Sequence, residues 1–293
     1  MKVVLHLGAH STDEDHLVSC LRKNETTLAE QGIVVPDPLR YRPIMRKTFQ
    51  SPKDDVTSPE SRELILDAIV DEDEPDRLIL SHDSFISVAG NALQGDRIYP
   101  SISRKVTRIA QLFEGHELEL FLAIKDPGLF IPALFERAPE KDFGKFMEGK
   151  DPQKMRWSET IADLHTAMPE AKITVWSNED APLIWPELLT ALTGHDEFTV
   201  LEGQDDFIRT LMMWRGYKRM RAFMEKSPPS SIKQRRMIVG SFLEKFPIYD
   251  GMNAIIELPD WSADYVNSLT TLYYQDLEEI EKMDGITYIS PFS

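Results

Sequence analysis

Short apolar runs alternate with amphipathic stretches along most of the chain. Four runs are nearly continuous in apolar residues, at positions 3–5, 77–81, 118–124 and 173–176. Continuous rather than alternating apolar residues are typical of parallel strands that are buried on both faces. Because stretches of helical spacing separate the four runs, we predict an α/β fold, a three-layer sandwich around a central, mostly parallel sheet.

The amphipathic stretches predict the helices of this sandwich. Apolar residues recur at helical spacing in 14–31, 101–114, 130–137, 154–168 and 182–192. Ser58 followed by Pro59 predicts a helix that starts there and continues to about Val70. Residues 206–285 are predicted to be mainly helical, and a short extended tail follows at 286–289.

Residues 37–60 interrupt this regularity. They are rich in proline and charge and show neither a helical nor a strand period, so we predict an irregular surface excursion. The acidic run at 71–76 predicts a turn. The 293 residues contain no internal repeat and can bury one large core. We therefore predict a single domain over residues 1–293.

Charge and cysteine content narrow the function classes. Lysine and arginine number 33 against 49 aspartates and glutamates, a formal net charge of −16. This argues against nucleic acid as a partner, because binding its backbone needs a basic face. No apolar run approaches the roughly 18–20 residues that span a bilayer, and the start predicts a first strand, not a signal peptide. Cys20 is the only cysteine, which excludes an intramolecular disulfide and favours a cytoplasmic location.

The polar loop after the first strand is the most informative stretch. A strand, a turn at Gly8 and a helix N-terminus form the usual scaffold for holding a phosphate. The loop itself reads Ser11-Thr12-Asp13-Glu14-Asp15, with three acids where a phosphate loop needs lysine and glycine. Acids at a helix N-terminus are structurally favourable, because they complement the dipole and cap open amides.

Polar residues also follow the next two strands. The segment 82–84 reads His-Asp-Ser, and 125–127 reads Lys-Asp-Pro. Open α/β sheets bind ligands at the carboxyl ends of their strands. We therefore expect a small molecule or a protein to bind at this edge.

These patterns together resemble the bacterial sulfotransferase family that uses 3′-phosphoadenosine 5′-phosphosulfate (PAPS). In that family the first strand runs into H-x-G-x-x-K-T-G-T-T, and a later strand ends in S-x-E. This chain matches with His6, Gly8 and Thr12 in the loop and with Ser81-His82-Asp83 at the later strand. Further matches are Asn24, Leu28, Gly32, Ile33, Pro36, Tyr273, Asp276, Gly285 and Pro291. The resemblance implies a P-loop NTPase-like, sulfotransferase-type fold.

The departures from the family concern its PAPS-binding residues. Ser11 replaces the loop lysine, Asp13 replaces the glycine, and Glu14-Asp15 replace the two threonines. Lys125 keeps the charge of a family arginine but not its bidentate fork. The resemblance thus implies a degenerate site at Gly8, Ser11, Thr12 and Lys125, with PAPS or its desulfated product PAP as cofactor only if the protein is active.

The acceptor side is better matched. Asp83 replaces a family glutamate that takes the proton of the acceptor hydroxyl, and His82 is a second candidate base. The alternative is that Asp83 caps the following segment in an Asx-type turn. A metal could also be bound if His6, His10 and His82 converged with Asp13, Asp15 or Asp83, but no ligand spacing supports this, and we assign no metal.

Three functions are compatible with the sequence. The first is a binding or regulatory protein that has lost PAPS-dependent sulfuryl transfer. The second is an active sulfotransferase in which Lys125, with Arg104, Lys105 or Arg108, rebuilds the donor site. The third is a protein-interaction module that uses the sheet edge and the Met/Arg-rich segment 209–226.

Overall fold

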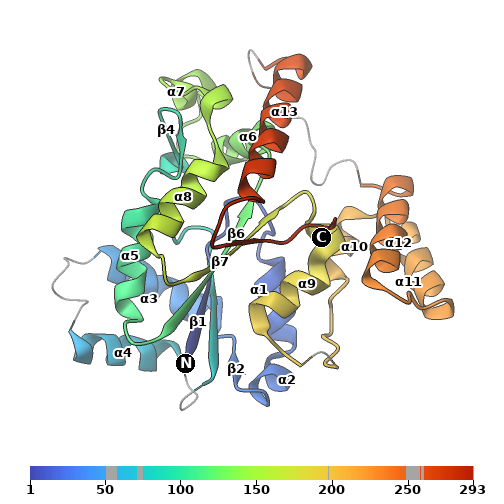
Figure 1. The fold of residues 1–293 in the computed structure, drawn as a ribbon, viewed down its shortest axis with the longest axis horizontal. Helices are drawn as coiled ribbons and strands as arrows, with labels where there is room; N and C mark the ends of the chain where they lie inside the picture. The colour runs from blue at the N-terminus through green and yellow to red at the C-terminus, as the bar shows by residue number, and fades with distance from the viewer. Residues whose placement is uncertain (51–57, 71–74, 197, 249–257, 259–260, 293) are drawn as a thin grey trace.

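Six parallel strands form the central sheet (Figure 1). The computed structural model describes residues 1–50, 58–70, 75–196, 198–248, 258 and 261–292. The strands are β1 (Lys2–His6), β2 (Ile33–Val34), β3 (Arg77–Ser81), β6 (Glu117–Ile124), β7 (Lys172–Ser177) and β8 (Ile286–Tyr288). Their order is β2-β3-β1-β6-β7-β8, and every neighbouring pair is parallel. The predicted α/β class with a parallel central sheet is therefore confirmed.

Helices cover both faces of this sheet (Figure 1). Val3 and Leu5 of β1 pack into one core, and Val4 packs into the other, as expected when successive side chains alternate across a strand. The first core includes residues of α3 (Pro38–Gln50), α4 (Pro59–Ile69), α5 (Ile102–Leu112), α6 (Pro127–Arg137), α7 (Phe143–Met147), α8 (Trp157–Ala167) and α13 (Ala263–Ile280). The second includes residues of α1 (His16–Lys23), α2 (Glu25–Ala29), α9 (Ala181–Thr193) and α10 (Asp206–Leu211).

Smaller elements complete the fold. The helices α11 (Trp214–Lys226) and α12 (Ile232–Lys245) pack with α10 in a third apolar cluster, to one side of the sheet (Figure 1). An antiparallel pair, β4 (Leu93–Gln94) and β5 (Arg97–Ile98), is separate from the main sheet. Two 3₁₀ turns, η2 (Ala89–Asn91) and η3 (Pro152–Lys154), lie in the connections. Within the described residues, no helix has the length and apolar character that a membrane crossing needs.

Polar side chains define where several helices start. The Ser58 hydroxyl accepts a hydrogen bond from the Ser61 amide at 3.2 Å, and Pro59 is the first residue of α4, as predicted. Asp126 accepts from the Gly128 amide at 2.7 Å and starts α6 directly after β6. The start of α6 therefore stays close to the carboxyl edge of the sheet.

The prediction of an irregular excursion over 37–60 is wrong for its first part. Residues 38–50 form the helix α3, even though Pro43 lies inside it. Burial overrides the weak helical pattern, because Tyr41 and Met45, four residues apart, are almost fully buried. The Tyr41 hydroxyl accepts from the Ser81 amide at 2.8 Å and donates to the Ser81 carbonyl at 2.6 Å. Residues 51–57 and most of the acidic run at 71–76 lie outside the described residues.

Two other predicted elements differ from the structure. The stretch 14–31 contains two helices, because α1 ends at Asn24, whose side chain donates to the carbonyls of Cys20 (2.8 Å) and Glu202 (2.9 Å). The Met/Arg-rich segment is also two helices, α10 and α11. The extended tail forms the sixth strand, β8.

Candidate functional site

The loop after β1 lies against the segment after β3 at the carboxyl edge of the sheet. His6 is opposite Ser81 in the register, so the two segments leave the sheet side by side. Gly8 has φ +87°, and a Cβ at this position would come within 2.8 Å of the Asp83 Cα. Only glycine combines this backbone angle with so close an approach. Gly8 thus allows the two segments to touch at Asp83.

A cavity of about 270 Å³ opens at this edge. Its lining includes the predicted residues Ser11, Thr12, His82 and Asp83. The other lining residues are His6, Ala9, Asp13, Glu14, Asp15, Arg42, Ser81, Ser84 and Arg137. The predicted residues Gly8 and Lys125 do not line it: Gly8 lies against the backbone of Asp83, and Lys125 contacts the loop from the end of β6.

Asp13 lies three residues before the start of α1 and caps it with its carboxylate, whereas the side chain of the N-cap residue Asp15 makes no capping bond. One carboxylate oxygen accepts from the Leu17 amide at 2.9 Å, and the Asp13 carbonyl accepts from the His16 amide at 2.9 Å. The Thr12 hydroxyl donates to the Ala9 carbonyl at 2.8 Å. Amides and a hydroxyl that could bind a phosphate are therefore already bonded within the loop.

The backbone of the loop has an unusual path. Ser11, Glu14 and Asp15 have φ values of 54°, 46° and 64°, all in the left-handed region. This region costs an L-residue roughly 1–2 kcal/mol, and β-branched residues are the least suited to it. The two threonines that the resemblance places at positions 14 and 15 would strain this conformation. The loop thus departs from the family in backbone conformation as well as in side chains.

Arg42 of α3 neutralises Asp15. Its guanidinium donates to both Asp15 oxygens, at 2.8 and 2.6 Å, and to the Ser81 carbonyl at 2.8 and 3.0 Å. The hydrogen bonds from Arg42 hold the pKa of Asp15 below its usual value. Sequence reasoning missed Arg42 because it lies in the stretch predicted to be irregular, and the Tyr41/Met45 spacing was the available signal.

Arg137, at the end of α6, neutralises Asp83. It donates to an Asp83 oxygen at 2.6 Å and lies 3.6 Å from Glu14 and 3.4 Å from the Ser11 hydroxyl. Burial acts to raise the pKa of Asp83, but His82 at 3.3 Å and the charge of Arg137 outweigh it and leave the pKa far below its usual value. No sequence motif marks Arg137, because it is the last residue of the 11-residue helix α6 and contacts Asp83 and Glu14 only through the tertiary fold.

Lys125 also binds the protein itself. Its ammonium donates to the Ser11 carbonyl at 2.9 Å, and burial lowers the pKa of this amine. The Lys125 carbonyl accepts from the Trp157 indole at 2.8 Å. Lys125 therefore fixes the loop to the end of β6.

His6 and His10 are buried and uncharged. Burial lowers the pKa of His6, whose Nδ1 is 2.8 Å from the Ser81 hydroxyl and whose ring stacks on Trp176. Burial lowers the pKa of His10 to about 4, and its Nδ1 is 2.6 Å from the Tyr99 hydroxyl. Among the described residues, no group of three or more histidines, cysteines or acids is placed to hold a metal ion.

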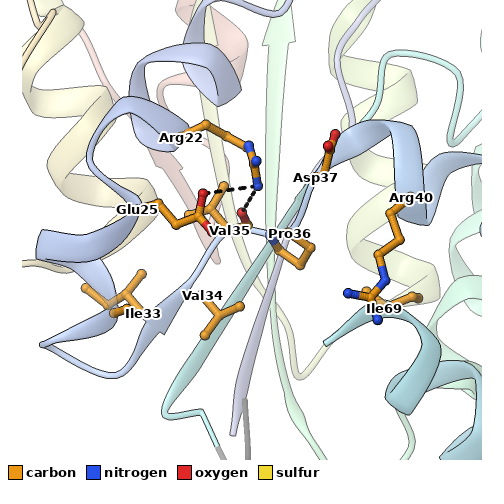
Figure 2. A pocket seen from close by; sticks show the side chains of 10 residues that line it. Arg22, Glu25, Ile33, Val34, Val35, Pro36, Asp37, Arg40 and Ile69 are labelled. Carbon is orange, nitrogen blue, oxygen red and sulfur yellow. Dashed lines mark hydrogen bonds and ion pairs between the residues drawn. The ribbon is translucent and has the colours of Figure 1, made fainter. Parts of the chain in front are cut away.

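A separate hollow of about 190 Å³ lies beside the edge strand β2 (Figure 2). Arg22 donates to the Val35 carbonyl at 3.0 Å and lies 3.4 Å from Glu25 (Figure 2). Arg40 donates to the Ala68 carbonyl at 2.7 Å, and Asp37 accepts from the Leu39 amide at 2.9 Å. Each charged group of this hollow thus has a structural role.

Comparisons of the chain with protein-family models, with curated proteins and with solved structures find no match.

Proposed function

We propose that this chain is a sulfotransferase-like protein that has lost PAPS-dependent sulfuryl transfer and serves as a binding protein, with its ligand at the carboxyl edge of the sheet. One observation carries the proposal. The Asp13 carboxylate accepts from the Leu17 amide at 2.9 Å, at the helix N-terminus where a donor phosphate would sit. An aspartate in this position stabilises the helix and excludes the anion.

The charges of the cavity support the same conclusion. Four carboxylates line it, from Asp13, Glu14, Asp15 and Asp83, against two guanidiniums, from Arg42 and Arg137. Each carboxylate near a phosphate would cost on the order of 1–4 kcal/mol, at effective dielectric constants of 80 to 20. Because the two guanidiniums already bind Asp15 and Asp83, a polyanion such as PAPS would have to break these pairs.

The state of Asp83 supports the loss of the chemical step. A general base works best when its pKa is near the working pH. Asp83 is ion-paired with Arg137 and has a pKa far below its usual value, so it is a weak acceptor for the proton of a hydroxyl. The contacts of its carboxylate are with the side chains of Arg137, His82 and Ser84, so it acts as an ion-pair partner rather than through the Asx-type turn expected as the alternative.

The finer parts of the proposal rest on the resemblance. They are the sulfotransferase-type, P-loop NTPase-like character of the α/β fold and a bacterial origin. The cytoplasmic location rests on the single cysteine. A cavity at the carboxyl edge of a parallel sheet is where such folds bind their ligands.

Transfer of labelled sulfate from PAPS to a panel of alcohols and phenols tests the proposal. We expect wild-type protein and the Asp83→Asn variant to give the same background signal as buffer. Transfer by the wild type that Asp83→Asn abolishes would overturn the proposal and identify an active sulfotransferase with Asp83 as base. Transfer that survives in Asp83→Asn would overturn it equally and leave Asp83 without a catalytic role.

A further inference from the structure

A second cavity, of about 460 Å³, adjoins the first. The two cavities share His82 and Ser84 in their linings. The second one is enclosed by α3, by the start of α5 and by the segment between β3 and η2. Its lining residues are Met45, Arg46, His82, Ser84, Phe85, Ile86, Ser87, Val88, Asn91, Ser101, Arg104 and Lys105. Its volume lies within the roughly 300–1,000 Å³ of small-molecule sites.

Three cations line this cavity, and no carboxylate does. They are Arg46 of α3 and Arg104 and Lys105 of α5. None of the three forms an ion pair or hydrogen bond through its side chain with any residue that the structure describes. In a chain with a net charge of −16, three such cations around one cavity form a local positive field that attracts an anion.

The position of Arg104 and Lys105 strengthens this interpretation. Both lie in the first turn of α5, which contains no acidic residue, and Ser101 at the N-cap makes no side-chain capping bond. The N-terminus of a helix carries partial positive charge, so cations are unfavourable there. An anion in the cavity would offset both the repulsion among the cations and their repulsion from the helix end.

The inner wall of the cavity is apolar. Phe85, Ile86 and Met45 contribute to it and are at most 3% exposed. Val88 also lines it and is 54% exposed. The site thus combines an apolar wall with a cationic rim, and a fully hydrated inorganic ion would leave the wall unused.

We propose that this second cavity binds a small amphiphile, with one anionic group held by Arg46, Arg104 and Lys105 and a short apolar body against Phe85, Ile86 and Val88. The anionic group is a sulfate, a phosphate or a carboxylate, since guanidinium and ammonium groups bind all three. The biological role of this site rests on the proposed binding function, for which the site specifies an anionic amphiphile as the class of ligand. The site itself stands whether or not the loop after β1 takes PAPS.

Calorimetric titration with octyl sulfate, octyl phosphate and octanoate tests the proposal, with octanol as the neutral probe. At least one of the three anions should bind about tenfold more tightly than octanol. The triple variant Arg46→Gln, Arg104→Gln, Lys105→Gln should weaken that binding by about 30-fold, and Arg104→Gln alone by about threefold. The charge-matched control Lys218→Gln, Lys226→Gln, Lys233→Gln removes three exposed lysines of α11 and α12 and should retain wild-type affinity.

Several results would overturn the proposal. They are equal affinity for octanol, unchanged binding in the Arg46/Arg104/Lys105 variant, equal weakening in the lysine control, or no binding of any anion at millimolar concentration. Circular dichroism of each variant verifies its fold, and the single Arg104→Gln variant at an exposed position guards against misfolding of the triple one. Sulfate transfer from PAPS would overturn the proposed function and leave this site intact, so the two failures are distinguishable.

Discussion

The two cavities at the carboxyl edge share His82 and Ser84 but differ in how their charged side chains are paired. In the first, Arg42 and Arg137 pair with Asp15 and Asp83. In the second, the three cations have no acidic partner among the described residues. A network whose charges are paired is part of the structure, whereas unpaired charges of one sign around a cavity favour a ligand of the other sign. The sequence draws attention to the first cavity, but the second has the stronger chemistry for binding.

The largest effect is expected at Gly8, where the loop after β1 meets the segment after β3. Gly8→Ala should lower the free energy of unfolding by about 3 kcal/mol, from the left-handed φ of +87° and the contact with the Asp83 backbone. Gly149 has φ +69°, but no atom lies within 4 Å of the position that its Cβ would take, so Gly149→Ala should cost only about 1 kcal/mol. Urea unfolding of both variants measures the difference. Equal losses of unfolding free energy in the two variants would show that the contact between Gly8 and the Asp83 backbone does not contribute to stability.

Acid should destabilise the fold through His10, which lies in the loop after β1 and lines neither cavity. Its pKa is about 4 in the folded protein against an ordinary 6.5, so the unfolded chain binds more protons between these values and stability falls as the pH falls. We expect His10 to account for about 2 kcal/mol of the stability lost between pH 7 and pH 4.5. Urea unfolding at both pH values should show a smaller loss for His10→Gln than for the wild type. Identical losses would mean that burial does not keep His10 neutral.

A smaller effect is expected where Asp13 caps α1. Asp13→Ala should lower the free energy of unfolding by about 1 kcal/mol, because the Leu17 amide loses its acceptor. Asp13→Asn keeps an acceptor oxygen and should lose less. The exposed Glu136 of α6 offers the control Glu136→Ala, which should change stability little. An Asp13→Ala variant with the same free energy of unfolding as the wild type would contradict the capping role.

The sequence predicted the four inner strands of the sheet, and at the edges it predicted the extended tail that forms β8 but not its place in the sheet. Continuous apolar runs identify β1, β3, β6 and β7, because these strands are buried on both faces. The edge strands β2 and β8 have only two and three residues, which are too few to show the apolar run or alternation that identifies a strand. The helix α3 was missed because its contacts through Tyr41, not its local pattern, stabilise it.

The candidate site was predictable to the same extent. Strand-end reasoning brought Ser11, Thr12, His82 and Asp83 to one cavity, because their segments leave adjacent parallel strands. Arg42 and Arg137 reach the cavity from helices that follow other strands, so no spacing within the sequence links them to it. The sequence offers Arg104 and Lys105 as possible donor-site residues, but they line the neighbouring cavity with Arg46.

Calorimetric titration of PAP into the Arg46→Gln, Arg104→Gln, Lys105→Gln variant, which lacks the cations of the second cavity, tests most directly whether the loop after β1 has lost its phosphate site. With the Leu17 amide bonded to Asp13 and the Lys125 ammonium bonded to the Ser11 carbonyl, no saturable binding is expected up to about 1 mM PAP, a limit of roughly −4 kcal/mol in binding free energy. Saturable binding with a micromolar Kd would contradict this and show that PAP displaces both contacts.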